Sequence, residues 1–211
     1  MTDQQHAFAL AFLEQLPLEG WHTILDIGAG PGHQSEWFKQ HGKEVTAVDL
    51  RPPLTDIPHI DNDAETLHSI PNEFVDAVWT HHAFEHMLSP LRALQQVNRV
   101  LKPNGWLFFT VPQINGTISS GHINSYDMPL VIYHLAMCGF DTRHGYFGKF
   151  NSHLRCAVRK VSAPSMETSV RALWDAGMLP ESCGKKILQT GRYDASSLRT
   201  KWLNGRTHEY S

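Results

Sequence analysis

A short apolar run that leads directly into three closely spaced glycines restricts the fold of this chain more than any other feature. Residues 23–27 are Thr-Ile-Leu-Asp-Ile, a composition typical of a buried strand. Gly28, Gly30 and Gly32 follow at once. Glycine can adopt sharp turns that other residues avoid, and it lets the backbone approach a ligand closely. A helix predicted over residues 33–41 then aims the free N–H groups of its first turn at that ligand.

The rest of the chain alternates short apolar strands with segments of helical periodicity. We predict further strands at 44–49, 59–61, 74–80, 106–111, 140–147 and 153–161, and helices at 4–16, 90–101 and 126–138. This alternation is typical of an α/β fold with helices on both faces of a parallel sheet. The last two strands form a hairpin, so one of them runs antiparallel. We therefore expect a Rossmann-like, doubly wound, mostly parallel seven-stranded sheet with an antiparallel closing strand.

Local signals refine this picture at the ends of two helices. Ser89 and Pro90 are typical of a helix start, with serine as N-cap and proline at the first helical position. Gly139 is a good C-cap for the helix at 126–138. Pro103-Asn104-Gly105 predicts a turn that leads into the strand at 106–111.

The regular alternation of strand and helix patterns ends after residue 161. Ala163-Pro164-Ser165 predicts a linker, and two short helical patterns follow at 169–176 and 195–203. A chain of 211 residues has room for one full domain. We therefore predict a domain over residues 1–162 that includes the N-terminal helix, and a short C-terminal helical extension over 163–211.

Composition excludes several classes of protein. The chain is 41% hydrophobic and 18% charged, which is typical of a globular protein. Its net charge of −3 gives no overall attraction to nucleic acid or anionic lipid. No apolar run approaches the ~18 residues of a membrane helix, and residues 1–6 lack the basic segment of a secretory signal. The three cysteines form no CxxC pair, so we expect a reduced, cytoplasmic protein.

The spacing of the glycine loop separates two classes of ligand. Dinucleotide-binding loops follow the pattern GxGxxG, whereas this loop is GxGxG with Asp26 two residues ahead of it. A carboxylate at that position is unsuited to a phosphate but suits an ammonium group. Asp49 ends the next strand, where an acidic residue can accept hydrogen bonds from both ribose hydroxyls. S-adenosylmethionine carries both an ammonium group and a ribose, so the pattern favours it as the cofactor.

These segments together resemble the class I S-adenosylmethionine-dependent methyltransferases. The resemblance covers most of residues 20–160 and rests on the glycine loop, Val48-Asp49, Asp63-Ala64-Glu65, the strand at 74–80 and the segment 99–105. It implies that Asp49 holds the ribose and that Asp63 and Ala64 hold the adenine edge. Asn104 stands where the family more often has glycine. The cofactor residues that we predict are Asp26, Gly28, Ala29, Gly30, Gly32, Asp49, Leu50, Asp63, Ala64 and Thr80.

Fourteen histidines are an unusual number for this chain length, and several stand at the expected ligand-binding edge of the sheet. His82, Glu85 and His86 follow the strand at 74–80, and a helical turn over 82–87 would bring all three to one face. His122 lies in a loop after the next strand and so over the same edge. Three imidazoles and one carboxylate could converge there.

This spacing resembles a branch of metal-dependent O-methyltransferases that carry Glu-x-x-Glu-His at this point. His82 stands at the first glutamate, Glu85 and His86 match, and His122 is the counterpart of a later histidine. The resemblance implies a metal site of these four residues, and imidazole in place of carboxylate favours iron, zinc, manganese or cobalt over magnesium. An alternative stays open, because metal-free class I enzymes also carry Glu-His here. His86, with His82 beside it, would then be a catalytic base, a pocket residue or purely structural.

A hydroxyl nucleophile requires a base or a metal, so we expect O-methylation of a small-molecule or sugar hydroxyl. One alternative is a methyltransferase-like sensor or accessory protein that binds the cofactor without transferring methyl. A dehydrogenase is a weaker rival. A metal-dependent 2′-O-methyltransferase that acts on nucleic acid is disfavoured by the net charge. The extension nevertheless has a basic bias, from Lys185, Lys186, Arg192, Arg199, Lys201 and Arg206. The sequence does not indicate an oligomeric state.

Overall fold

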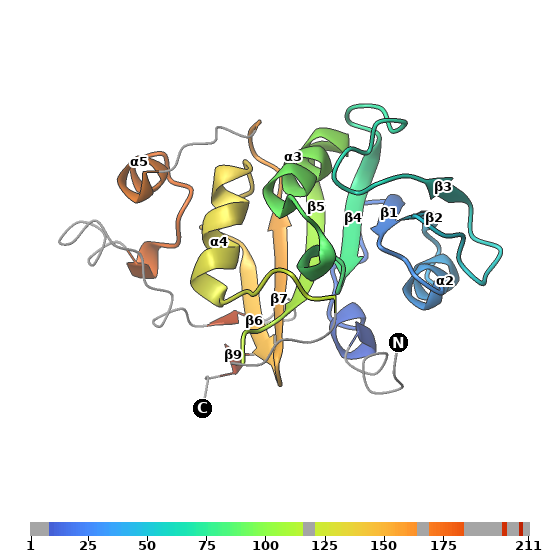
Figure 1. Ribbon diagram of the computed structural model, residues 1–211. Helices are drawn as coiled ribbons and strands as arrows, with labels where there is room; N and C mark the ends of the chain where they lie inside the picture. Colours follow the sequence, from blue (N-terminus) through green and yellow to red (C-terminus); the bar gives the residue numbers. More distant parts are fainter. Residues whose placement is uncertain (1–8, 116–120, 164–168, 184–199, 202–206, 209–211) are drawn as a thin grey trace.

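A sheet of seven strands runs through the part of the chain that the structure, a computed structural model, describes: residues 9–115, 121–163, 169–183, 200–201 and 207–208. Its strands are β1 (Thr23–Ile27), β2 (Glu44–Asp49), β3 (His59–Asp61), β4 (Val75–His81), β5 (Leu101–Pro112), β6 (Tyr146–Phe150) and β7 (His153–Arg159). Their order is β3-β2-β1-β4-β5-β7-β6 (Figure 1). Neighbours from β3 to β5 run parallel, whereas β7 pairs antiparallel with β5 and β6. The predicted Rossmann-like sheet with an antiparallel closing strand is confirmed.

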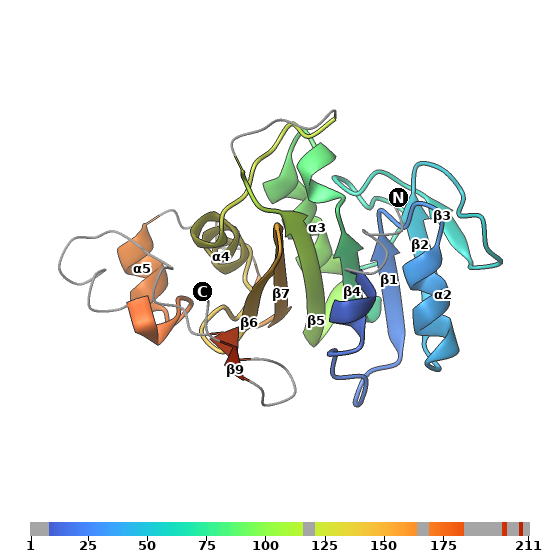
Figure 2. The ribbon, with the colours of Figure 1, turned by 90° about the horizontal axis from the view of Figure 1, so that it is seen from below.

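Helices cover both faces of this sheet, as the alternating pattern predicted. Helices α3 (Pro90–Val100) and α4 (Met128–Met137) lie on one face, and α2 (His33–Gln40) and the helical residues 9–13 lie on the other (Figures 1 and 2). Residues 4–8 of the predicted N-terminal helix lie outside the described residues. None of the helices in the described part of the chain has the length and apolarity that a bilayer crossing needs.

The central strand β4 shows why both faces must be covered. Alternate side chains of a strand point to opposite faces, and in β4 both sets are buried. Val78 packs in the cluster under α3 with Leu94, whereas Trp79 packs in the cluster on the other face. There the ring of Trp79 lies 5.6 Å from the rings of Phe12 and Phe38. The near-continuous apolar run of β4 is therefore typical of a strand buried on both sides.

The predicted strand at 140–147 is wrong over its first six residues. Phe140 makes only an isolated bridge to Lys160, and β6 begins at Tyr146. The side chain of Asp141 accepts hydrogen bonds from the backbone N–H and from the ring of His144, at 3.0 and 2.9 Å. These local bonds fold the chain into a turn, because aspartate side chains compete with ladder pairing for nearby backbone groups.

At two of the predicted helix and turn positions, the observed structure differs from the one we expected. Ser89 occupies the N-cap position of α3, but its side chain makes no capping hydrogen bond. Asn104 adopts a φ of +61°, and the predicted turn lies inside β5 as a register shift against β4. Gly139, with a φ of +82°, follows the last turn of α4 as predicted.

The first part of the C-terminal extension packs onto the domain. The predicted helix at 169–176 is observed as α5 (Val170–Asp175), and the Ser169 side chain caps it through Ala172 N–H at 3.2 Å. A single turn, η2 (Glu181–Cys183), follows. The predicted helix at 195–203 is wrong at residues 200–201, which form strand β8 (Thr200–Lys201) paired with β9 (Thr207–His208), and its other residues lie outside the described ones.

Candidate functional site

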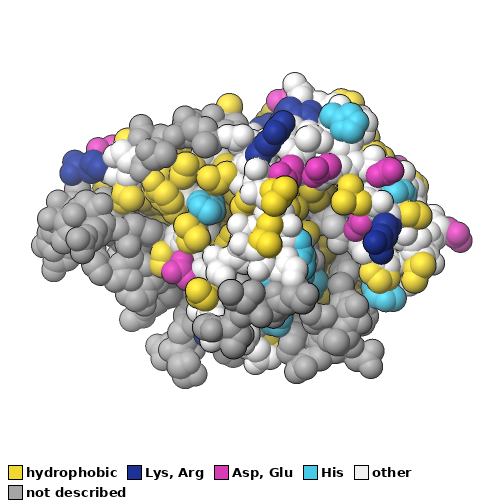
Figure 3. All heavy atoms as spheres, viewed as in Figure 1, with side chains coloured by type: hydrophobic (Ala, Val, Ile, Leu, Met, Phe, Trp, Pro, Cys, Tyr) yellow, Lys and Arg dark blue, Asp and Glu magenta, His cyan; other side chains and the backbone are white. Residues whose placement is uncertain are grey.

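A cleft of about 350 Å³ opens at the carboxyl ends of β1, β2 and β4. This is the edge at which doubly wound sheets bind their ligands. On the face shown in Figure 3, acidic and histidine side chains gather over the half of the molecule that holds β2, β3 and β4. The cleft is lined by Gly28, Val48, Asp49, Leu50, Asn62, Asp63, Ala64, Glu65, His82, Ala83, His86, Met87 and Leu88.

The glycine loop forms one wall of the cleft and has no room for a side chain at its first position. Gly28 has a φ of +76°, and its N–H donates to the Val48 carbonyl at 2.8 Å. A β carbon on Gly28 would lie 2.5 Å from the β carbon of Ala83. Gly30 N–H donates to Asp49 Oδ2 at 2.9 Å, so the loop is fixed against the end of β2.

Hydrogen bonds also fix the acidic wall of the cleft. Asp49 Oδ1 accepts from Arg51 N–H at 3.1 Å, and Asp63 Oδ1 accepts from Glu65 N–H at 2.8 Å. Glu65 in turn accepts from Leu88 N–H at 2.6 Å. This last bond ties the segment after β3 to the segment after β4. The predicted ribose and adenine residues therefore face one cleft together with His82 and His86, whereas His122 is not part of its lining.

The segment after β4 does not form the helical turn that the sequence analysis assumed. His82 has a φ of +55°, in the left-handed region, and a single 3₁₀ turn, η1 (Phe84–His86), begins only after it. The ligating atoms of Glu85, His86 and His122 lie within 4.8 Å of one another, whereas His82 does not belong to this group. The rings of His86 and His122 are nearly perpendicular, with centroids 4.9 Å apart.

Backbone hydrogen bonds hold the loop with His122 against this turn. The N–H groups of Ile123 and Asn124 both donate to the Glu85 carbonyl, at 2.9 and 3.1 Å. The Asn124 side chain donates to the Met87 carbonyl at 2.6 Å. Because two loops far apart in the sequence are bonded in this way, the position of His122 beside His86 is a property of the fold.

The Glu85 side chain is the least satisfied group of the site. It is fully buried, and among the described residues neither carboxylate oxygen has a hydrogen-bond partner. His82 Nδ1 lies 3.0 Å from Glu85 Oε1, but the two groups are not aligned for a hydrogen bond. A buried carboxylate in this state is costly unless a cation or a proton compensates it.

Comparison with known proteins identifies the domain. Residues 25–109 match a family model described as a methyltransferase domain. The chain carries a class I S-adenosylmethionine-dependent methyltransferase domain. The matched region begins in β1 and ends in β5, so it contains the glycine loop, both acidic segments and η1.

Relatives agree with this assignment over about half of the chain. A malonyl-[acyl-carrier protein] O-methyltransferase of Salmonella typhimurium is 33% identical over 122 residues, which cover 51% of this chain and 45% of that protein. A ubiquinone biosynthesis O-methyltransferase of Coxiella burnetii is 32% identical over 109 residues, 46% of each chain. This chain therefore matches less than half the length of these relatives.

A solved structure shares the fold. The 1,6-didemethyltoxoflavin-N1-methyltransferase of Burkholderia thailandensis, crystallised with S-adenosylhomocysteine, superposes with a TM-score of 0.59 at 19% identity. The superposition covers 76% of this chain and 78% of that one.

Several residues that we predicted for the cofactor site do not line the cleft of the methyltransferase domain. Asp26, Ala29 and Thr80 are buried and are not part of the lining. Burial raises the pKa of Asp26 to about 7, although the Ser35 hydroxyl donates to it at 2.6 Å and so favours the charged form. Nor do Gly30 and Gly32 line the cleft.

Sequence analysis missed other residues that the methyltransferase domain brings to the cleft. Asn62 and Glu65 flank the predicted Asp63-Ala64 pair, and Met87 and Leu88 follow His86. Each of these residues is adjacent in the sequence to a predicted site residue or to another residue of the lining, and this adjacency could have indicated them. His153, whose Nδ1 lies 2.7 Å from His82 Nε2, is 71 residues away along the chain and had no local signal.

Proposed function

We propose that this chain is an S-adenosylmethionine-dependent methyltransferase that transfers the methyl group to a hydroxyl oxygen of a small molecule or a sugar. The observation that carries the proposal is the exposed imidazole of His86, which lines the cleft close to the glycine loop. The names of the two curated relatives support an oxygen acceptor, whereas the superposed structure is an N1-methyltransferase. The test must therefore compare hydroxyl and nitrogen acceptors.

The acidic and glycine walls of the cleft fit this cofactor. S-adenosylmethionine, when bound, supplies a methyl group on a positively charged sulfur. Asp49 would accept hydrogen bonds from the ribose hydroxyls, as its place at the end of β2 favours. Gly28 would let the backbone approach the ligand, since it carries no side chain. The hydrogen bonds from Gly30 and Arg51 orient the Asp49 carboxylate before any ligand arrives.

His86 is suited to take a proton from an acceptor. Its Nδ1 lies 2.8 Å from the Gly121 carbonyl oxygen, which accepts but cannot donate, so Nδ1 carries the hydrogen. Neutral His86 then has its lone pair on Nε2. Methyl transfer forms a bond from the acceptor oxygen to the methyl carbon, and the carbon–sulfur bond breaks with its electron pair on sulfur. The hydroxyl proton must leave, and His86 Nε2 can accept it.

We propose a divalent transition metal at the same group of residues as the second form of this function, in which His86 Nε2 would bind the metal and would no longer be the base that accepts the proton. Glu85, His86 and His122 offer one carboxylate and two imidazoles within 4.8 Å, a ligand set that suits iron, zinc, cobalt or manganese. A cation there would compensate the buried Glu85 carboxylate, which has no hydrogen-bond partner among the described residues. Such a metal acts as a Lewis acid and lowers the pKa of a bound hydroxyl.

The test begins with calorimetric titration of S-adenosylhomocysteine and elemental analysis of untagged protein purified without chelator. Formation of S-adenosylhomocysteine is then followed with panels of small-molecule hydroxyls, sugars, amines and short RNAs. We expect transfer to a hydroxyl, and we expect His86→Ala to lower the rate by about 10²- to 10⁴-fold while cofactor binding persists. His144→Ala is the matched control, because the His144 ring is exposed and pairs with Asp141, away from the cleft.

Each of the other possible results would change the proposed function in a different way. Tight cofactor binding without transfer to any acceptor would make the chain a sensor or accessory protein. Transfer by metal-free protein would leave His86 as the base and remove the metal from the proposal. Unchanged turnover in His86→Ala would refute both roles of His86, and transfer only to RNA or to amines would replace the acceptor class.

A further inference from the structure

His82 stands between two side chains that come from different parts of the fold. Its Nδ1 lies 3.0 Å from Glu85 Oε1, and its Nε2 lies 2.7 Å from Nδ1 of His153, the first residue of β7. The rings of His82 and His153 meet edge to face, with centroids 4.7 Å apart. Both ring nitrogens of His82 are therefore occupied by protein groups. His82 does not belong to the group formed by Glu85, His86 and His122.

The backbone holds His82 in this place. Its φ of +55° is uncommon for a residue other than glycine, and its N–H donates to the Thr110 carbonyl of β5 at 3.1 Å. The conformation turns the chain out of β4 and is fixed by the neighbouring strand. The His82 side chain is only 12% exposed, so it has little freedom to leave the contact with Glu85.

The positions of the protons follow from the partners. A lone pair on His82 Nδ1 would repel the Glu85 carboxylate oxygen at 3.0 Å, so this nitrogen carries a hydrogen. In neutral His82 the lone pair is then on Nε2, and His153 Nδ1–H donates to it. His153 thus fixes the tautomer of His82, and the His82 Nδ1–H lies beside the Glu85 carboxylate at ion-pair distance. Partner groups of this kind orient metal-binding and catalytic side chains in many proteins.

We propose that His82 and His153 are positioning residues that hold the Glu85 carboxylate toward the pair formed by His86 and His122. This inference rests on the proposed function, since it assigns a task to Glu85 in that site. His82 acts through Glu85 and not as a fourth ligand. His153 lies in neither the cleft lining nor the group of possible ligands, and its contact with the ring of His82 links it to that group.

The test compares His153→Leu, which removes the nitrogen next to His82, with His153→Asn, whose amide N–H can occupy the place of Nδ1. The probe is Co²⁺, followed by its visible absorption, and S-adenosylhomocysteine affinity checks that the domain is folded. We expect His153→Leu to weaken Co²⁺ binding by about 10- to 100-fold and to alter the spectrum. His153→Asn should restore much of the affinity, and both variants should bind S-adenosylhomocysteine as the parent chain does.

A second readout does not depend on metal. In ¹⁵N-histidine spectra, with the His82 signals assigned through a His82→Asn variant, the two ring nitrogens should show the Nδ1–H tautomer. They should shift in both Glu85→Gln and His153→Leu. If the parent chain binds no Co²⁺, the metal part of the proposed function fails, and these spectra alone decide the positioning role. Co²⁺ affinity and His82 signals that His153→Leu leaves unchanged would overturn the inference.

Discussion

Gly28 and Ala83 approach each other so closely that a β carbon on Gly28 would lie 2.5 Å from the β carbon of Ala83. Gly28 leaves β1 and Ala83 follows β4, so this contact joins the glycine loop to the segment that carries His82 and His86. The two halves of the candidate site are therefore packed against each other, and any side chain at residue 28 must displace the segment that holds the histidines.

Replacement of Gly28 by alanine should damage cofactor binding and stability together. The left-handed backbone alone costs about 1–2 kcal/mol for a residue with a side chain, and the collision with Ala83 adds about 1–3 kcal/mol of overpacking. We expect the affinity for S-adenosylhomocysteine to fall at least about tenfold, which corresponds to roughly 1.4 kcal/mol. Calorimetric titration and chemical denaturation measure the two effects.

Gly42 offers a matched control, since it also has a φ of +76° but no atom within 4 Å of the place of a β carbon. Gly42→Ala should lower stability by the backbone cost alone and leave cofactor affinity unchanged. The double variant Gly28→Ala, Ala83→Gly should recover part of the affinity. If Gly28→Ala binds the cofactor like Gly42→Ala, the close contact has no role in the site.

Arg99 should support cofactor affinity without touching the cleft. Its guanidinium donates to the carbonyls of Ile70 and Leu67, at 2.7 and 2.8 Å, and to the Asn72 side chain at 2.9 Å. These bonds tie the segment that follows Asp63 to α3. Arg99→Lys keeps the charge but cannot span all three acceptors. Since each charge-assisted bond contributes about 1.5–3 kcal/mol, we expect a fall in stability of this order and a KM for S-adenosylmethionine raised more than kcat is lowered.

The control for Arg99 is an arginine in an exposed ion pair. Arg171 pairs with Asp175 within α5, and both side chains are more than half exposed. Arg171→Lys should change neither KM nor stability by a measurable amount, because exposed pairs contribute about 0–1 kcal/mol. Equal kinetic behaviour of the two variants would show that the segment after Asp63 holds its place without Arg99.

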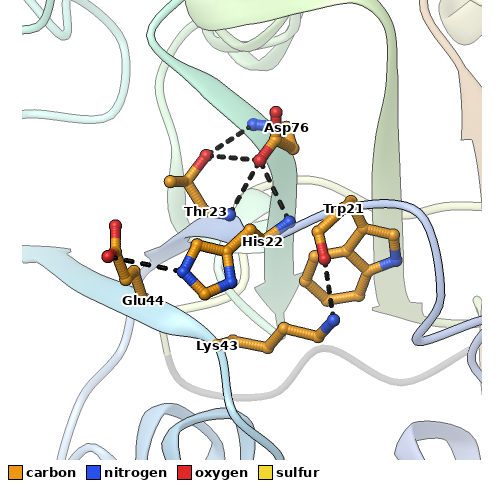
Figure 4. Close-up of polar contacts among 6 residues, drawn as sticks. All are labelled: Trp21, His22, Thr23, Lys43, Glu44 and Asp76. Carbon is orange, nitrogen blue, oxygen red and sulfur yellow. Dashed lines mark hydrogen bonds and ion pairs between the residues drawn. The ribbon is translucent and has the colours of Figure 1, made fainter.

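Asp76 should stabilise the domain at neutral pH and lose that effect in acid. Its Oδ2 accepts from the N–H groups of His22 and Thr23 and from the Thr23 hydroxyl (Figure 4). Lys102 donates to its Oδ1 at 2.7 Å. Partial burial opposes ionisation, but these hydrogen bonds outweigh it and hold the pKa of Asp76 well below its usual value. Asp76→Asn should therefore cost at least about 2 kcal/mol at pH 7.

The sign of the pH dependence follows from that lowered pKa. A carboxyl group that binds protons less readily in the folded state stabilises it above the unfolded pKa of about 3.9, and the advantage disappears as pH falls further. The difference between the parent chain and Asp76→Asn should thus shrink below about pH 4. Glu44 is the control in the same cluster, because its carboxylate pairs with the exposed ring of His22, at 3.4 Å (Figure 4). Glu44→Gln should change stability little at any pH.

The sheet and the glycine loop were predictable because their signals are local. The apolar runs of β1 and β4 and the glycines between β1 and α2 each specify their own structure within a few residues. The position of His82 was not predictable in this way. Helical periodicity put it on one face with Glu85 and His86, but its left-handed backbone is held by β5 and its ring by His153, and both contacts are long-range. A local sequence pattern does not indicate which residues far away in the chain a side chain will contact.

Asp26 should affect the pH dependence of folding stability in the opposite direction to Asp76. It is 1% exposed, and burial raises its pKa to about 7. The folded state therefore retains this proton where the unfolded state, with a pKa of about 3.9, has released it. Folding stability then falls as pH rises from about 4 to about 7, and the loss is complete above that window. In an Asp26→Asn variant, the amide oxygen would accept the hydrogen bond from Ser35 without carrying a charge.

We therefore expect Asp26→Asn to be as stable as the parent chain near pH 4 and more stable by about 4 kcal/mol at pH 8. Denaturation curves at these two pH values measure the difference, and Asp76→Asn, whose effect has the opposite sign at neutral pH, is the internal comparison. A parent chain that loses no stability between the two pH values, relative to Asp26→Asn, would mean that Asp26 is ionised in the folded protein. The Ser35 hydroxyl, which donates to Asp26 at 2.6 Å, would then be the group that compensates its charge.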